Sequence, residues 1–155
     1  MHVRQLEIGD FGFLQNLASK QLNFTIPPSY VLWLFMRIEG AVCLVAEQPQ
    51  EGLLAYLLAV PIEGPEKSLF VWQLAASAGK AQGEAIHLIL TTLRDLAMRN
   101  GVKAIAFSMR PRSAAYRLVS RYTRELIART PRLSSALPSV VSRDESEYRI
   151  ELPSP

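Results

Sequence analysis

The sequence predicts an α/β fold in which a β-sheet carries helices on both faces. Strand-like and helix-like segments alternate along the 155 residues in the order β-α-α-β-β-β-α-β-α-β. The central strands are apolar almost without interruption, which requires cover on both sheet faces. Because no internal repeat and no second domain is visible, we expect a single domain over residues 1–155.

The first segments predict a strand, a helix and a loop. Val3–Ile8 alternates weakly between apolar and polar residues, which is typical of a first or edge strand. Asp10 can cap a helix over Phe11–Lys20, whose apolar residues fall on one face. The two prolines of Asn23–Pro28 then predict a loop.

A second helix is predicted over Tyr30–Glu39. Ser29 is its candidate N-cap and Gly40 its candidate stop. Because residues 31–35 are all apolar, we expect more than one side of this helix to be covered.

Three strands are predicted next. Ala41–Glu47 and Gly52–Ile62 are separated by Gln48–Glu51, a length suited to an antiparallel hairpin. Ser68–Ala76 is a further run rich in β-forming residues.

The rest of the chain predicts helix, strand, helix and strand. Gln82–Arg99 carries a wide apolar stripe of helical period. Val102–Met109 predicts a buried strand and Pro111–Tyr122 another helix. Ile127–Ser142 is rich in Pro, Ser and Arg and predicts a long loop, before a closing strand over Glu147–Leu152.

Composition excludes several classes of protein. The apolar and charged shares, 49% and 20%, are those of a folded globular protein, and the longest apolar stretches are too short to cross a bilayer. No secretory signal is expected, because no basic start precedes an apolar stretch and a cleavage site. Cys43 is the one cysteine and no Cys/His spacing resembles a zinc site, so we expect no disulfide and no metal. The expected compartment is the cytoplasm.

Charge is distributed unevenly along the chain. Residues 1–93 hold 5 basic and 8 acidic residues, whereas residues 94–155 hold 12 and 6. Between Arg99 and Arg132, nine basic residues face one acid, Glu125. This run is a candidate surface for a phosphorylated ligand or an acidic partner, and solvated charge is the alternative. No nucleic-acid-binding motif accompanies it, so we do not expect nucleic acid as a partner.

The residues from Phe70 to Ile86 form the most informative segment. A buried strand runs into a loop of small residues, and this loop opens the long helix. Such a junction directs unpaired backbone N–H groups and the positive helix end at one point, where a phosphate can bind. Gly79 and Gly83 allow close approach of the ligand, and Lys80 adds a positive charge.

In this context the segment resembles the acyl-CoA-binding motif of the GNAT acetyltransferase superfamily, which has a strand, a Gln/Arg-x-x-Gly-x-Gly/Ala loop and a long helix. Residues 78–83 read Ala-Gly-Lys-Ala-Gln-Gly. Gly83 matches the last glycine, whereas Ala78 and Ala81 replace the leading Gln/Arg and the first glycine. The resemblance implies a mixed, largely antiparallel sheet and acetyl-CoA as co-substrate, with its pyrophosphate on this loop.

The chain is also similar to the diaminobutyrate acetyltransferases of ectoine biosynthesis. The similar segments are Leu69–Ala75, Lys80–Gly83, Ser29-Tyr30 and Glu145-x-x-Tyr148-Arg149-Ile150. This resemblance implies a homodimer. It also implies direct transfer of an acetyl group from acetyl-CoA to a primary amine of a diamino acid or related small molecule.

The resemblance also implies which residues form the site. Those for the coenzyme are the strand end and the loop, namely Leu74, Ala75, Ala76, Gly79, Lys80, Ala81, Gln82 and Gly83. Glu145 would hold or deprotonate the amine, and a solvated turn is the alternative. Tyr116 would protonate the leaving thiolate if the alignment is shifted by one residue, whereas alignment on Arg110-Pro111 places Arg117 at this position.

Three residues are assigned to the amine substrate by the same resemblance. Trp72 and Tyr30 would line its pocket, with core packing and a helix edge as the respective alternatives. In the loop before the second helix the family carries Asp and Asn, whereas this chain has Thr25 and Pro27. The alternative function is a catalytically weak or inactive GNAT-fold binding module that uses the basic 99–132 face for an acidic partner.

Overall fold

The computed structural model describes residues 1–21, 24–126, 134–138 and 145–153. The chain divides into two compact units, each described by itself: unit 1 is Met1–Val60 with Trp72–Leu93, and unit 2 is Pro61–Val71 with Arg94–Pro155. The elements of the described residues, in chain order, are β1 (His2–Gln5), a 3-10 turn (Ile8–Asp10), α1 (Phe11–Ser19), α2 (Ser29–Phe35), β2 (Val42–Gln48), β3 (Gly52–Ile62), β4 (Ser68–Ala76), α3 (Gln82–Arg99), β5 (Ala104–Met109), α4 (Ala114–Leu126), β6 (Ser134–Pro138) and β7 (Ser146–Glu151).

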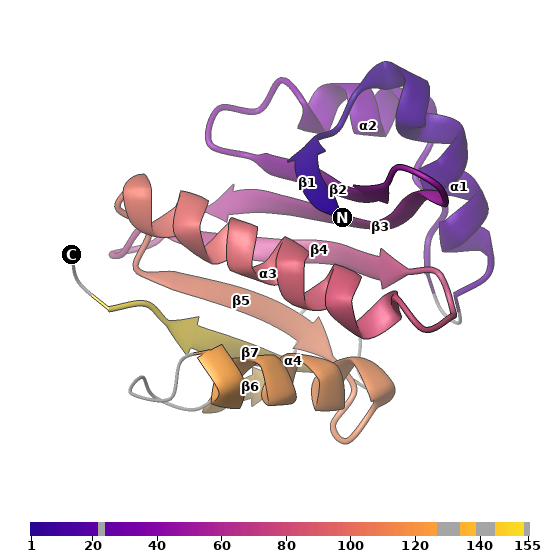
Figure 1. Ribbon diagram of the computed structural model, residues 1–155. Helices are drawn as coiled ribbons and strands as arrows, with labels where there is room; N and C mark the ends of the chain where they lie inside the picture. Colours follow the sequence, from indigo (N-terminus) through magenta and orange to yellow (C-terminus); the bar gives the residue numbers. More distant parts are fainter. Residues whose placement is uncertain (22–23, 127–133, 139–144, 154–155) are drawn as a thin grey trace. The chain divides into compact units, whose positions relative to one another are not determined.

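The strands of unit 1 confirm the predicted hairpin. β1 pairs with β2 and β2 with β3, all antiparallel (Figure 1). The turn closes where Gln48 pairs with Gly52, whose positive φ of 76° favours glycine. After β4, the backbone N–H of Ser77 donates to the carbonyl of Leu54 at 2.7 Å. The turn and the end of β4 therefore belong to one region of unit 1.

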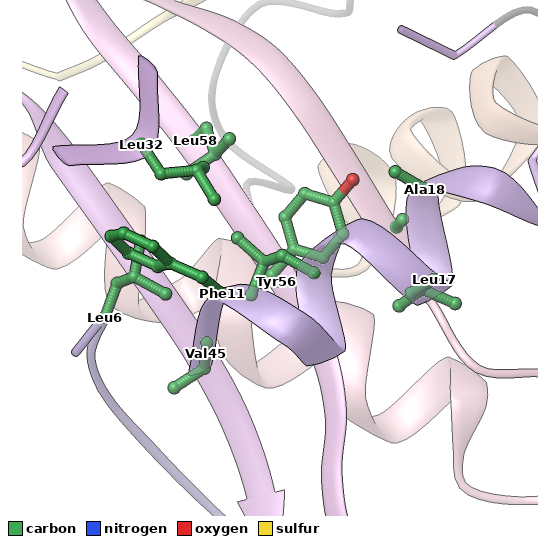
Figure 2. Packing of buried hydrophobic residues seen from close by; sticks show 10 residues of the cluster. Leu6, Phe11, Leu17, Ala18, Leu32, Val45, Tyr56 and Leu58 are labelled. Atoms are coloured by element: carbon green, nitrogen blue, oxygen red, sulfur yellow. The ribbon is translucent and has the colours of Figure 1, made fainter. Parts of the chain in front are cut away.

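Both faces of the unit 1 sheet are covered. On one face, residues of β2 and β3 pack against α1 and α2, and Figure 2 shows the Tyr56 ring within this cluster. The alternate residues Leu44, Ala46 and Leu57 face the other way and are equally buried. The first half of α3 belongs to the same unit, and its Ile89 is fully buried. The apolar strands of the sequence therefore predicted their two-sided burial correctly.

The sequence predicted Asp10 as the cap of α1, but its side chain makes no capping hydrogen bond to that helix. Its carboxylate instead accepts two hydrogen bonds from the guanidinium of Arg4, at 2.8 and 2.9 Å, and one from the backbone N–H of Glu7. The hydrogen bonds from Arg4 hold the pKa of Asp10 below its ordinary value. The Asp10 side chain is 8% exposed, so the ion pair ties β1 to the start of α1 in a largely buried position.

Helix α2 is shorter than predicted and less covered. It begins at Ser29, with Pro28 in the N-cap position and no side-chain cap. It ends at Phe35, because the following N–H groups of Arg37 and Ile38 bond three residues back and tighten the chain into turns. Only Leu32 is buried within the helix, so the expectation that several of its sides are covered was wrong.

Unit 2 contains the parallel pair of the sheet. Residues 68–71 of β4 pair in parallel with Ala104–Phe107 of β5, and β5 pairs antiparallel with β7. β7 also pairs antiparallel with β6, in a segment where the sequence predicted a loop. The Ser-Ser-Ala-Leu-Pro sequence of β6 has weak strand propensity, and pairing with β7 makes it a strand. With one parallel pair among antiparallel ones, the predicted mixed, largely antiparallel sheet is confirmed.

In the described part of the chain, no helix combines the length and the apolar character that spanning a membrane requires.

The ion pair of Arg4 gives a prediction on stability. Replacing Asp10 by Asn should lower the free energy of unfolding at pH 7 by about 1.5–3 kcal/mol, because hydrogen bonds to a charged, largely buried group are lost. Since the folded-state pKa of Asp10 is depressed, its contribution is present above the unfolded pKa and disappears as pH falls through the folded value. Urea unfolding at several pH values should therefore show the two proteins converging below pH of about 4.

The matched control is Asp95→Asn. Asp95 pairs with its neighbour Arg94 but is half exposed, so its loss should change stability by less than about 1 kcal/mol at any of these pH values. Equal effects of the two substitutions would show that the Arg4 pair does not stabilise unit 1.

Candidate functional site

The turn from β4 into α3 places the first backbone N–H groups of the helix at the end of the strand. Within the first turn, the N–H of Gln82 donates to the carbonyl of Gly79 at 3.3 Å and that of Ala85 to Ala81 at 2.9 Å. The first N–H groups of an α-helix have no acceptor inside it, and the helix dipole adds positive potential at this end. The junction therefore has the geometry of an anion site.

A cavity of about 440 Å³ lies at this helix end, entirely within unit 1. The turn between β2 and β3 and the loop after β4 supply its walls. The lining residues are Gln48, Glu51, Leu54, Ser77, Ala78, Gly79, Lys80, Ala81, Gln82 and Glu84. Four of the residues assigned to the coenzyme are thus brought together, Gly79 to Gln82, whereas Leu74, Ala75, Ala76 and Gly83 are not among the lining residues.

The two loop glycines leave the backbone open to a ligand. A Cβ atom added at Gly79 or at Gly83 would meet no atom within 4 Å, so each faces open space. Gly79 also has a φ of 144°, a conformation that other residues rarely adopt. Glycine at position 79 therefore keeps the path of the loop, and glycine at 79 and at 83, the second residue of α3, leaves the backbone there accessible.

The charges around the cavity are mixed. Lys80 contributes the one ammonium group of the lining, and Glu51 and Glu84 contribute two carboxylates. An acidic residue in the first turn of a helix is favoured by the helix dipole, a signal that marks Glu84 in the sequence. Gln48 and Glu51 could not be found in this way, because only the tertiary structure brings the hairpin turn beside the loop.

Gln82 connects the helix to the end of β4. Its side-chain Nε2 donates to the carbonyl of Ala76 at 3.3 Å. The pairing of β4 with β5 ends at Val71 and Phe107, and β4 continues five residues further, to Ala76. Leu74 lies half-buried in this last part, beyond the residues paired with β5.

The residues assigned to the amine lie in or beside the α2 segment of unit 1. Thr25 is exposed in the loop before α2, and its carbonyl accepts a hydrogen bond from Nε2 of Gln73 at 2.7 Å. Trp72 is half-buried and packs edge-on against Phe35, with ring centroids 5.1 Å apart. Tyr30 is 67% exposed on the first turn of α2. Thus neighbouring residues of β4 contact the loop before α2 and the last residue of that helix.

The two catalytic candidates both lie in unit 2. The Ser108 hydroxyl of β5 donates a hydrogen bond to the Glu145 carboxylate, which therefore has a fixed partner just before β7. The ring of Tyr116, on the first turn of α4, lies 5.0 Å from that of Tyr148. The contact partner Ser108 was missed by sequence reasoning, because its pairing with Glu145 depends on the register of β5 against β7.

Comparison with known proteins finds matches to the fold of the chain but not to its sequence. No protein-family model matches the chain, and no curated protein matches it either. Solved structures do match. A diaminobutyrate acetyltransferase from Paenibacillus lautus, solved with its substrate L-2,4-diaminobutyric acid and coenzyme A, has a TM-score of 0.74 at 23% identity, covering 96% of this chain and 93% of its own.

Two further acetyltransferase structures superpose over nearly the whole chain. The aminoglycoside 6'-N-acetyltransferase of Enterococcus faecium has a TM-score of 0.69 at 12% identity, covering 100% of this chain and 99% of its own. The ribosomal-protein-S18-alanine N-acetyltransferase of Escherichia coli has a TM-score of 0.66 at 14% identity, covering 97% and 92%. The chain has the GNAT acetyltransferase fold.

The two departures from the GNAT loop motif both lie in the cavity lining. Ala78 stands where the motif has Gln or Arg, and Ala81 where it has a glycine. The first removes a polar side chain and the second adds a methyl group, but the helix end and the open glycines are retained. The GNAT fold of this chain therefore keeps the backbone part of the motif and loses part of its side chains.

Proposed function

We propose that this chain is an N-acetyltransferase that uses acetyl-CoA, and that it forms a single acyl-CoA N-acyltransferase-like domain over residues 1–155. The observation that carries the proposal is the cavity at the amino end of α3, which Gly79 lines and whose lining residues Gln82 and Glu84 flank the open backbone at Gly83. Backbone N–H groups and a helix dipole suit a pyrophosphate without requiring specific side chains. The shared fold of acetyltransferase structures supports the same function.

Acetyl-CoA supplies a thioester carbonyl that an amine can attack directly. Backbone N–H groups at Leu74 to Ala76, past the last residue of β4 that pairs with β5, would stabilise the oxyanion that develops on this carbonyl. Lys80 and the first N–H groups of α3 would hold the pyrophosphate. No covalent enzyme intermediate is needed, because the amine nitrogen attacks the thioester carbon itself and the C–S bond breaks when the tetrahedral oxyanion collapses.

Proton transfer falls to the two unit 2 residues in this proposal. An amine with a pKa of about 10 arrives as ammonium and must lose a proton before it attacks. Glu145, held by the Ser108 hydroxyl, would take this proton directly or through water. Tyr116 would donate its phenolic proton to the departing thiolate of coenzyme A.

The proposed acceptor is a small primary amine, a diamino acid or a related compound. The diaminobutyrate acetyltransferase with the same fold supports this class. Thr25, Tyr30 and Trp72 would contact the amine substrate. Because the loop carries Thr25 and Pro27, it offers no carboxylate to a second ammonium group, so monoamines are as suitable as diamines. The reaction would take place in the cytoplasm.

We include a homodimer in the proposal, with α2 as the contact surface. Apolar residues of α2 and the following turns are exposed, namely Tyr30, Trp33, Leu34, Met36 and Ile38. The closing strand β7 pairs with β5 on one side and with β6 on the other, so it is not free to pair with a second copy. Light scattering should give twice the 17.3 kDa chain mass, and Leu34→Glu should shift the protein toward monomer. A wild-type monomer at all concentrations would contradict the dimer.

The coenzyme site is tested by binding and by a matched pair of glycine variants. Acetyl-CoA at 100 times its Kd should stabilise the wild type by roughly 2.7 kcal/mol in thermal unfolding. Gly83→Ala and Gly12→Ala both replace an exposed helical glycine whose added Cβ meets nothing, so both should leave stability equal or up to about 1 kcal/mol higher. Only Gly83→Ala should weaken acetyl-CoA binding.

Coenzyme release with a panel of amines completes this test, starting from L-2,4-diaminobutyrate, amino acids and polyamines. Absence of any thermal shift at saturating acetyl-CoA would contradict the proposed acetyltransferase function. It would favour the alternative, a GNAT-fold binding module, for which the exposed Arg112, Arg117 and Arg121 provide a basic surface.

Glu145 and Tyr116 are tested by isosteric substitutions. Glu145→Gln should lower kcat for amine acetylation by about 100-fold, because general acid–base catalysis contributes 10²–10⁴-fold, and acetyl-CoA affinity should stay within about twofold. Tyr116→Phe should lower kcat in the same way, with less effect when a more acidic thiol is the leaving group. Glu147→Gln serves as control, since the Glu147 carboxylate lies two residues further on, 3.9 Å from the Arg149 guanidinium, and the Ser108 hydroxyl donates to Glu145. Equal losses in all three variants would remove both residues from the site.

A further inference from the structure

A buried glutamine connects the strand that ends at the coenzyme cavity to the loop before α2. Gln73 of β4 is 5% exposed, and its Nε2 donates to the Thr25 carbonyl at 2.7 Å. Its Oε1 accepts a hydrogen bond from the hydroxyl of Tyr56 at 2.9 Å, and Tyr56 is fully buried in β3. All three residues belong to unit 1.

These hydrogen bonds fix the orientation of the Gln73 amide. The Thr25 carbonyl can only accept, so the amide nitrogen must face it and the amide oxygen must face Tyr56. Burial raises the pKa of Tyr56, so its hydroxyl stays protonated and can donate the hydrogen bond to Gln73. Turning the amide over would bring its oxygen against the Thr25 carbonyl oxygen and lose that hydrogen bond, while the Tyr56 hydroxyl could then only accept instead of donate.

Neighbouring contacts hold the same segment at other points. Trp72, next to Gln73 on β4, packs against Phe35 at the end of α2. From α1, the side-chain amide of Gln15 donates to the Pro27 carbonyl at 3.1 Å. The segment from residue 25 to 35 is therefore held to β4 at both of its ends.

A purely structural role does not explain the glutamine well. A buried amide costs free energy unless its hydrogen bonds are made, as both are here, and apolar groups in place of both Gln73 and the Tyr56 hydroxyl would fill the same volume without this requirement. Thr25 lies in an exposed loop, where water could serve its carbonyl instead. The amide at position 73 thus serves mainly to determine where the loop lies along β4.

We infer that Gln73 is a positioning residue for the acetyl acceptor: it holds the loop at residues 24–28 against β4, next to the strand segment that would carry the thioester. The inference rests on the proposed N-acetyltransferase function. Gln73 thus holds the loop of the proposed amine site to β4, the same strand whose N–H groups would contact the thioester. Tyr56 acts one step further away, by keeping the amide in its orientation.

The test uses two variants of this network and one matched glutamine control. Gln73→Met keeps length and volume but removes both hydrogen bonds, and Tyr56→Phe removes only the hydroxyl. Gln82→Met is the control, because Gln82 also bonds a backbone carbonyl, that of Ala76, but lies in the coenzyme cavity.

With acetyl-CoA and the best amine of the panel, Gln73→Met should lower kcat/KM for the amine by about 10-fold through misplacement of the loop. The Kd for acetyl-CoA should stay within about twofold. Tyr56→Phe should also lower kcat/KM for the amine, by a smaller factor than Gln73→Met. Gln82→Met should show the reverse pattern, with weaker acetyl-CoA binding as its main effect.

Hydrogen exchange supplies a readout that does not depend on turnover. Exchange of the amides of residues 24–26, the loop residues before Pro27 that carry an N–H, should become faster in Gln73→Met, and that of the amides at 77–84 should not change. Faster loop exchange with unchanged kinetic constants would show a structural role only and overturn the inference. Unchanged loop exchange would overturn it as well.

Failure of the proposed function has a different signature. If the wild type releases no coenzyme A with any amine, the proposed acetyltransferase function is contradicted, and so is the positioning role of Gln73 that rests on it. The exchange data would then still establish whether Gln73 anchors the loop, so the two failures are told apart.

Discussion

The course of β4 is the constraint on which the site depends. Its first four residues pair with β5, and its last five run past that pairing and lead within a five-residue loop to the start of α3. A chain that turns this quickly from strand to helix presents its first helical N–H groups at the turn, where no carbonyl of the helix can reach them. The anion-binding geometry is therefore a consequence of backbone path, and it survives substitutions such as Ala78 and Ala81.

Two glutamines form hydrogen bonds near the two parts of the proposed site. Gln73 is buried and bonds the carbonyl of a loop on the α2 side, whereas Gln82 opens α3 and bonds the carbonyl at the end of β4. Both side chains hold backbone carbonyls, and Gln82 also lines the cavity. In the proposed enzyme this arrangement lets the amine side and the coenzyme side vary independently, because each has its own anchor. Such independence suits a fold that serves acceptors as different as an aminoglycoside and a ribosomal protein.

The charge of the cavity is the feature that sets this chain apart from a simple phosphate site. Glu51 and Glu84 stand beside one ammonium group, Lys80. Their repulsion of a pyrophosphate is screened by salt, since the cavity is open to solvent. In the proposed enzyme, the backbone N–H groups would therefore supply most of the favourable interaction with the coenzyme, and glycine at 79 and 83 would keep that backbone accessible.

The sequence by itself determined the elements whose patterns are local. The bounds of β3, β4 and α3 were predicted correctly, because a long apolar run or a wide helical stripe does not depend on what it packs against. The glycines at the start of α3 likewise identified the loop. Tertiary structure decided the rest: β6 is a strand only through pairing with β7, Asp10 is bound by Arg4 instead of capping α1, and the hairpin turn at Gln48 to Glu51 became a wall of the cavity. In each case the deciding interaction joins residues far apart in the chain or competes with a local one of similar strength, and a sequence pattern carries no record of such a partner.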